Sequence, residues 1–166
     1  RGAVPAFLDY QPQGAAYPFP ATLCVSINDE VVHGIPNEKR ILRNGDVVTL
    51  DAGLSYQGYF VDSARTIIVG DDTVSGGIVG ELSLAQRGLG DLKAHQLINA
   101  TTEALKAAIA AAKVGGHIGD IGAAVVRVAR NRNFAIVEDL GGHAVGKTVH
   151  EQPFIANDGK AGEGEE

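Results

Sequence analysis

Residues 47–69, VVTLDAGLSYQGYFVDSARTIIV, decide the fold of this chain. Two apolar runs, 47–54 and 59–69, flank the dipeptide Gln57-Gly58. A two-residue connection that contains glycine is typical of a tight β-hairpin turn. The sequence therefore predicts two antiparallel strands, in which Asp51 lies opposite Ala64 and Asp62 lies opposite Gly53.

Asp51 and Asp62 are charged residues in the middle of these apolar strands. In the predicted register both side chains project from one face as diagonal neighbours, about 5 to 8 Å apart at Cβ. Two carboxylates that close repel each other, unless they share a proton, pair with an arginine such as Arg65, or bind cations between them. The spacing alone leaves these possibilities open, and an ion pair or a turn cap is the purely structural alternative.

Three histidines are further candidates for chemistry. His143 and His150 lie seven residues apart around Gly146, in a glycine-rich stretch that favours loop or extended backbone over helix. A neutral imidazole can complete a carboxylate metal site or donate a hydrogen bond to a carbonyl oxygen. His33, in VVHGIP, joins them for the same reason, although a lone histidine is more often a surface or core residue.

The rest of the chain predicts a mixed α/β (α+β) organisation in one domain, 1–166. The pattern indicates an extended opening at 1–21, a strand hairpin at 22–33, amphipathic helices from Asp91 and from an N-cap at Asp120, and a strand at 134–140. In the first helix, Ile98, Leu105 and Ile109 recur at helical spacing. The glycine-rich stretch 71–90 is predicted to link a first half, about 1–70, to a second half, about 91–166.

Composition excludes several classes of protein. With 166 residues, 45% hydrophobic and 20% charged, the chain is expected to fold as a globular domain. No apolar stretch approaches the roughly 18 to 20 residues of a membrane span, and the first residues lack the basic-then-apolar pattern of a signal peptide, so a cytoplasmic protein is expected. The single cysteine, Cys24, rules out an internal disulfide, and it is expected to be a packing or pocket residue rather than a nucleophile.

Charge and motifs narrow the function further. The formal net charge of −6 gives no electrostatic footprint for nucleic acid. The sequence contains no phosphate-binding loop, no dinucleotide-binding glycine motif and no G-x-S-x-G nucleophile elbow. Any metal site has to be built from His, Asp and Glu, because one cysteine cannot make a thiolate site.

Six features carry a resemblance to a known family: AVPAFLDY at 3–10, CVSINDEVVHGIP at 24–36, NGDVVTLDAG at 44–53, the Asp51-x10-Asp62 spacing, IGDIGAA at 118–124 and GGHAVGKTVHEQP at 141–153. In these features the chain resembles the methionine aminopeptidases of bacterial type I, over nearly its whole length. The resemblance implies the pita-bread fold, in which a curved antiparallel sheet carries helices on its outer face in two pseudo-symmetric halves. It also implies the reaction, which is removal of the initiator methionine by a hydroxide bound to two divalent metal ions.

By position, the resemblance implies roles for individual residues. Asp51, Asp62 and His143 match the metal ligands, of which Asp62 would bridge both ions. His33 matches a histidine that contacts the substrate, and His150 matches the one that hydrogen-bonds the scissile carbonyl and the developing oxyanion. Cys24 and Phe19 fall where the family lines its methionine pocket. These residue types accept Co, Mn, Fe or Zn, so the metal is left open.

The resemblance also implies partners and departures. Peptides with an N-terminal methionine are the expected substrates, the ribosome surface is a further expected partner, and a monomer without membrane or specific nucleic-acid binding is expected. The family completes its site with two glutamates that this chain does not match, and its preceding helix is absent, so a chain truncated at both ends is expected. The alternatives are a non-catalytic pita-bread binding module and a prolidase-like or creatinase-like hydrolase on the same fold.

Overall fold

The structure, a computed structural model, describes residues 2–12, 14–70 and 89–166. Its contacts divide the chain into two compact units: Arg1–Gly77 with Val145–Glu151, and Ile78–Ala144 with Gln152–Glu166. The predicted linker at 71–90 lies outside the described residues, except that its last two residues begin a helix. The predicted halves stay a prediction, and the observed units differ from them by assigning residues 145–151 to the first unit.

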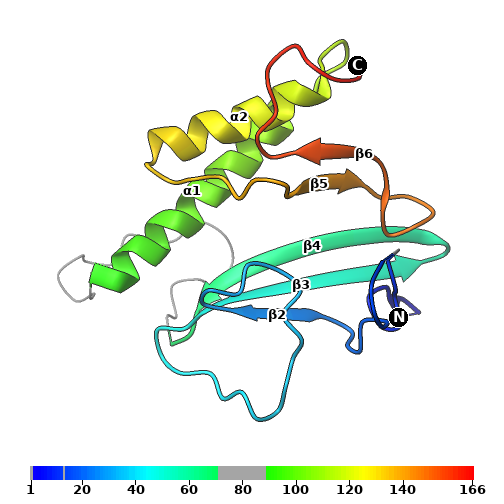
Figure 1. Cartoon of the computed structure of the whole chain (residues 1–166), viewed down its shortest axis with the longest axis vertical. Coiled ribbons are helices and arrows are strands. Elements are labelled where there is room, and N and C mark those ends of the chain that lie inside the picture. The colour runs from blue at the N-terminus through cyan, green and yellow to red at the C-terminus, as the bar shows by residue number, and fades with distance from the viewer. Residues whose placement is uncertain (1, 13, 71–88) are drawn as a thin grey trace. The chain divides into compact units, whose positions relative to one another are not determined.

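The central element of the first unit is a long hairpin of β3 (Val47–Tyr56) and β4 (Tyr59–Ile68), drawn in cyan to green in Figure 1. Asp51 pairs with Ala64 and Asp62 with Gly53, so the predicted register is confirmed. The turn residues Gln57 and Gly58 have φ values of 52° and 80°. Two successive left-handed residues are typical of the turn whose twist matches that of a hairpin.

Two shorter strands complete the sheet on the other edge of β3. They are β1 (Val4–Pro5) and β2 (Cys24–Ile27), and both run antiparallel to β3. The predicted hairpin at 22–33 is therefore wrong: β2 pairs with β3, and Val31 and Val32 are exposed outside any strand. The side chain of Asn28 accepts a hydrogen bond from the Val47 N–H and thereby ties the end of β2 to the start of β3.

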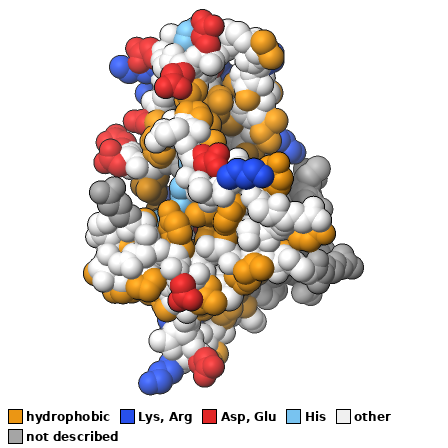
Figure 2. Space-filling model, turned by 90° about the vertical axis from the view of Figure 1, so that its right-hand side faces the viewer, with side chains coloured by type: hydrophobic (Ala, Val, Ile, Leu, Met, Phe, Trp, Pro, Cys, Tyr) orange, Lys and Arg blue, Asp and Glu red, His pale blue; other side chains and the backbone are white. Residues whose placement is uncertain are grey.

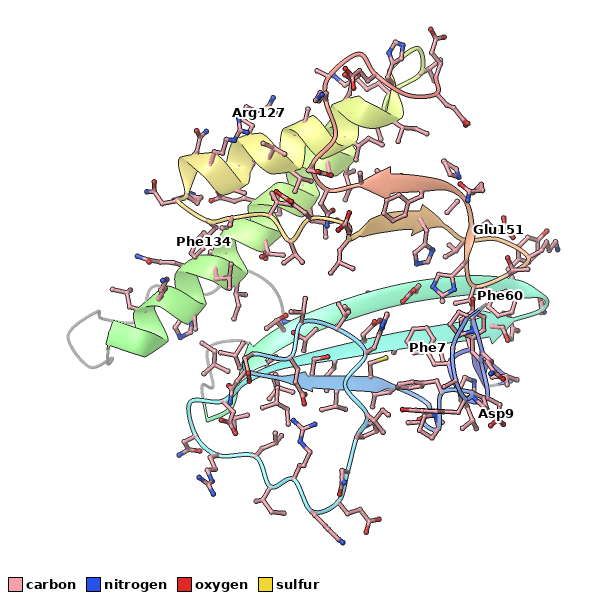
Figure 3. The ribbon with its side chains drawn as sticks, viewed as in Figure 1. Phe7, Asp9, Phe60, Arg127, Phe134 and Glu151 are labelled. Carbon is pink, nitrogen blue, oxygen red and sulfur yellow. The ribbon has the colours of Figure 1, made fainter. Side chains whose placement is uncertain are left out.

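The two faces of this sheet differ in character. One face carries Cys24, Asp51 and Asp62, together with a hydrogen bond of 2.9 Å between the hydroxyls of Thr49 and Thr66. A hydrophobic cluster lies on the same face; its buried members are Phe7, Cys24 and Val149, and Ala6, Tyr10, Phe19 and Phe60 pack against them. Figure 3 shows Phe7 and Phe60 near the turn end of the hairpin. On the opposite face the exposed side chains include Leu50, Leu54 and Val61.

The second unit contains α1 (Leu89–Ala111), α2 (Ile118–Asn131) and a two-stranded sheet of β5 (Gly141–Ala144) and β6 (Glu151–Ala156), of which Glu151 alone is assigned to the first unit (Figure 1). Both helices occur where the sequence predicts them. The buried residues that the structure describes on α1 are His95, Ala100 and Ala104. Leu105 and Ile109 are 61% and 65% exposed. The apolar spacing thus identified the helix but not the face that it buries.

Two local predictions in this unit are wrong. The N-cap of α2 is His117 rather than Asp120, which lies at the third helical position and accepts a hydrogen bond from the His117 N–H. That arrangement is half of a capping box, in which a carboxylate inside the first turn satisfies a donor before it. The segment 134–140 contains no strand. Asn133, just before this segment, and Asp139, near its end, have positive φ values of 58° and 63°, which interrupt extended backbone.

Charged side chains of both signs are scattered over the face drawn in Figure 2. On the face drawn in Figure 2, the Lys and Arg side chains stand apart from one another. Arg127 and Arg130 are exposed, as predicted, and Arg132 forms an ion pair with Glu103. Among the described residues, no helix is both long and apolar enough to span a membrane.

Candidate functional site

The pair of Asp51 and Asp62 lies on one face of the first unit's sheet. Asp51 is flanked by its pairing partners, Cys24 on β2 and Ala64 on β4. Asp62 pairs with Gly53, two residues along β3 from Asp51. Because alternate strand residues share a face, both carboxylates project from the same side of the hairpin. Both residues are half-buried, which concentrates negative charge at a partly desolvated position.

The negative charge of the two aspartates affects the pKa of the neighbouring Cys24 thiol. Burial, followed by the negative charges of Asp51 and Asp62, raises the pKa of Cys24 to about 11. Both aspartates therefore act on the same neighbouring atom from within electrostatic reach. The thiol is protonated at neutral pH, which supports the expectation of a packing or pocket residue over a nucleophile.

A wall of aromatic and aliphatic side chains stands beside the acidic pair. The ring of Phe7 lies directly on Gly53, in the space that a side chain there would fill. Cys24 and Phe19 both belong to this cluster. Sequence reasoning missed Phe7, Tyr10 and Val149 as members of it. The signal that could have found the first two is their place in the quoted stretch AVPAFLDY, where aromatics punctuate a proline-rich segment.

His150 lies in the loop 145–150, which belongs to the same unit as the acidic pair. The loop is fastened to β4 by a hydrogen bond of 2.8 Å from the Phe60 N–H to the Gly146 carbonyl. Its next residue, Glu151, accepts hydrogen bonds from the N–H groups of Lys147 and Thr148. These bonds lower the pKa of the Glu151 carboxyl, since they favour its ionised form.

His33 lies in the loop between β2 and β3 and is exposed, with a φ of 59°. The next residue, Gly34, accepts a hydrogen bond from the Val25 N–H and donates one to the Ser26 hydroxyl. A Cβ on Gly34 would collide with the Val25 backbone. Glycine is therefore required where the loop folds back onto β2, and this contact holds His33 beside the strand that carries Cys24.

His143 belongs to the second unit, in β5, and is half-buried. Its Nδ1 lies 3.1 Å from the Ala144 carbonyl oxygen. In the described part of the chain, no three or more His, Cys, Asp and Glu side chains are gathered into a group that could hold a metal ion. A site that joins His143 to Asp51 and Asp62 remains a prediction.

Nearly the whole chain matches the sequence model of a known protein family. The sequence model of metallopeptidase family M24 matches residues 4–166. The chain belongs to metallopeptidase family M24.

Relatives of this M24 chain are named as methionine aminopeptidases. It is 42% identical over 160 residues to the methionine aminopeptidase of Aquifex aeolicus, a match that covers 96% of this chain and 55% of the relative. It is 38% identical over 164 residues to methionine aminopeptidase B of Synechocystis, covering 99% of this chain and 53% of the relative. The chain thus spans about half the length of the curated relatives it matches.

Solved structures agree with this M24 assignment. The methionine aminopeptidase of Thermotoga maritima superposes with a TM-score of 0.76 at 33% identity, over 98% of this chain and 55% of that one. A prolidase of Pyrococcus horikoshii gives 0.63 at 25% identity, over 84% of this chain and 35% of that one. The predicted pita-bread fold is confirmed, and this M24 chain covers about half of the methionine aminopeptidase structure.

An M24 metallopeptidase implies divalent metal ions, and the first unit offers donors that fit them. Asp51 and Asp62 share a face, and both act on the pKa of Cys24. Carboxylate oxygens are ligands that Mn, Fe, Co and Zn all accept. Both carboxylates are half-buried, and a bound cation would neutralise their negative charge.

Proposed function

We propose that this protein is a metal-dependent aminopeptidase that removes the N-terminal methionine from peptides. The observation that carries the proposal is the register of the hairpin, which places Asp51 and Asp62 on one face. The same face carries the hydrophobic cluster, and His150 follows Val149, a buried member of that cluster. The names of the M24 relatives support the same reading.

The acidic pair would hold metal with the help of His143. Asp51 and Asp62 supply carboxylate oxygens, and His143 supplies an imidazole nitrogen from the second unit. We expect two divalent ions, chosen from Co, Mn, Fe and Zn by availability rather than by ligand type alone. When bound, such ions act as Lewis acids and lower the pKa of a coordinated water.

The histidines would orient the peptide bond. His150 is exposed and anchored on both sides, by the Gly146 contact to β4 and by the Glu151 hydrogen bonds. Its imidazole N–H is suited to donate to the scissile carbonyl oxygen, which gains negative charge in the transition state. His33, held beside β2, would contact the substrate near its N-terminal residue.

The hydrophobic cluster would recognise the methionine side chain. Cys24 and Phe19 supply an apolar surface, together with Phe7 and Phe60. A flexible thioether makes favourable contacts with aromatic rings, and the Cys24 thiol remains neutral at physiological pH. Burial of an unbranched apolar side chain there would position the following peptide bond next to Asp51 and Asp62.

The finer expectations belong to this proposal as well. Peptides with an N-terminal methionine are produced at the ribosome, so newly made chains in the cytoplasm are the natural substrates, and the ribosome surface is a candidate partner. We expect the protein to act as a monomer.

The experiment is a hydrolysis assay on Met-Ala-Ser, Leu-Ala-Ser and a Met-Pro dipeptide, with Co, Mn, Fe or Zn added one at a time. It is run with the 166-residue chain and with the full product of its reading frame. Preferential release of methionine from Met-Ala-Ser supports the proposal. Cleavage confined to the Met-Pro dipeptide would favour a prolidase-like enzyme. If both preparations bind the peptides and neither hydrolyses them, a non-catalytic binding module would be favoured.

A further inference from the structure

One side-chain contact joins the start of the chain to the candidate site. The Nδ1 atom of His150 lies 2.9 Å from the hydroxyl oxygen of Tyr10, a hydrogen bond between residues 140 positions apart. The two rings also stack at a tilt, with centroids 5.1 Å apart and an interplanar angle of 32°. Contact by both hydroxyl and ring restricts how the imidazole can turn.

Tyr10 itself is held firmly. Its backbone N–H donates to the Phe7 carbonyl, and its own carbonyl accepts from the Phe19 N–H at 2.8 Å. Its side chain packs against the cluster of Phe7, Cys24 and Val149. The hydroxyl is therefore presented from a fixed position on the sheet face.

His150 is held from the other side. Its neighbour Val149 is buried in the same cluster, with 4% of its surface exposed. The Thr148 hydroxyl donates to the His150 carbonyl at 2.9 Å. Tyr10 packs against the hydrophobic cluster, and His150 directly follows Val149, a member of that cluster. The packing of one cluster therefore restrains both partners of the hydrogen bond.

The chemistry of the two groups determines which proton arrangement is useful. A neutral imidazole carries one N–H, and the partner of one ring nitrogen decides where that proton lies. A phenol is protonated at neutral pH and can donate. If the Tyr10 hydroxyl donates to Nδ1, the proton of His150 lies on Nε2. If Nδ1 donates to Tyr10 instead, Nε2 has no proton to offer.

We propose that Tyr10 is a positioning residue for His150: its hydroxyl donates to Nδ1, fixes the ring and keeps the proton on Nε2, aimed at the substrate carbonyl oxygen. This inference rests on the proposed function, because it is the aminopeptidase reaction that needs a donor at Nε2. The role parallels that of the groups that orient metal-bound or catalytic histidines through their second nitrogen.

The first test is spectroscopic and needs no activity. Nitrogen-15 correlation spectra of the histidine rings, recorded above the pKa of imidazole and assigned with His150→Gln, show which nitrogen carries the proton. We expect His150 to carry it on Nε2, with Nδ1 as a hydrogen-bonded acceptor. In Tyr10→Phe the Nδ1 signal should move toward that of an unbonded acceptor. Tyr17→Phe, a change at a 62% exposed tyrosine outside the cluster, should leave it in place.

The second test is kinetic and uses whichever preparation hydrolyses Met-Ala-Ser. Loss of a positioning partner typically costs about 10-fold to 100-fold in activity. We expect Tyr10→Phe to lower kcat by about that factor, with little change in KM and none in metal stoichiometry. In a His150→Ala background, the same change should have no further effect, because the residue through which it acts is gone.

These tests separate the inference from the function on which it rests. A proton on Nδ1, or an Nδ1 signal that is the same in Tyr10→Phe and the parent, would overturn the inference. So would a kcat loss that persists in the His150→Ala background, since it would show that Tyr10 acts on the substrate directly. Absence of methionine release from every preparation would remove the proposed function, and the spectra would still report on the Tyr10–His150 contact.

Discussion

The ring of Phe7 occupies the space in which a side chain on Gly53 would stand. Three ring atoms, Cε1, Cδ1 and Cζ, are the nearest neighbours of that position. Gly53 pairs with Asp62, so the aromatic ring is packed against the strand residue that faces one of the two candidate metal ligands. Gly53 thus allows the ring of Phe7 to pack against β3 next to the residue that pairs with it, Asp62.

We expect Gly53→Ala to destabilise the fold by about 1 to 3 kcal/mol, the usual cost of forcing extra atoms into a packed core. The ring of Phe7 is 8% exposed and has to move if a methyl group is added. Urea denaturation, monitored by circular dichroism, measures the change in the free energy of unfolding. Gly142→Ala is the matched control, since nothing lies within 4 Å of its Cβ position. Equal stability of the two variants would contradict the packing argument.

Replacing either Asp51 or Asp62 by Asn should weaken binding of Mn or Co by at least about 10-fold, because a charged donor is lost. Isothermal titration calorimetry on the folded variants measures it directly. Asp29→Asn, in the exposed turn after β2, is the control and should bind as the parent does. Parent-like affinity in both site variants would show that the pair is not a metal site.

His150→Ala should lower kcat on Met-Ala-Ser by about 10² to 10³, the range seen when a donor to a developing oxyanion is removed. Metal stoichiometry, measured by elemental analysis, should stay unchanged. Loss of bound metal in this variant would instead identify His150 as a ligand and displace the role that we propose for it.

The stability of the second unit should depend on Asp120 in a pH-dependent way. Hydrogen bonds from the N–H groups of His117 and Gly162 lower the pKa of this carboxyl. A carboxyl whose pKa is lowered in the folded state stabilises the protein at pH values above its pKa in the unfolded chain, which is about 3.9. That contribution is lost as the pH falls through the folded pKa.

Asp120→Asn should therefore lower Tm at pH 7, and its difference from the parent should shrink as the pH falls below about 4. Thermal melts between pH 7 and pH 3 measure this convergence. Asp158→Asn, at an exposed position in the same unit, should follow the parent at every pH. A constant difference between Asp120→Asn and the parent across this range would contradict the assignment.

The hairpin could be predicted from the sequence because its signals are local. The Gln57-Gly58 turn fixes the register, and the register alone places Asp51 and Asp62 on one face. The pairing of β2 could not be predicted in this way. Alternation shows that Cys24–Ile27 is a strand, but its partner is chosen by contacts with β3, more than twenty residues along the chain.

The helical unit shows the same limit. Apolar spacing identified α1, but Leu105 and Ile109 are exposed, whereas the buried positions that the structure describes on this helix are His95, Ala100 and Ala104. A small residue gives almost no signal in a hydrophobicity pattern. The contact of Tyr10 with His150 was likewise invisible, because nothing in the chain links residues so far apart before the fold forms.

The two-residue turn between β3 and β4 also bears on the order in which the molecule assembles. Closing a short loop costs little chain entropy, and hairpins form within about 1 to 10 μs. The strands β1 and β2 have to close much longer loops before they can join β3. Asp51 and Asp62 therefore become neighbours through the most local pairing in the sheet. Divalent ions or dissolved salt that relieve the repulsion between them would favour this first step of folding as well as the finished site.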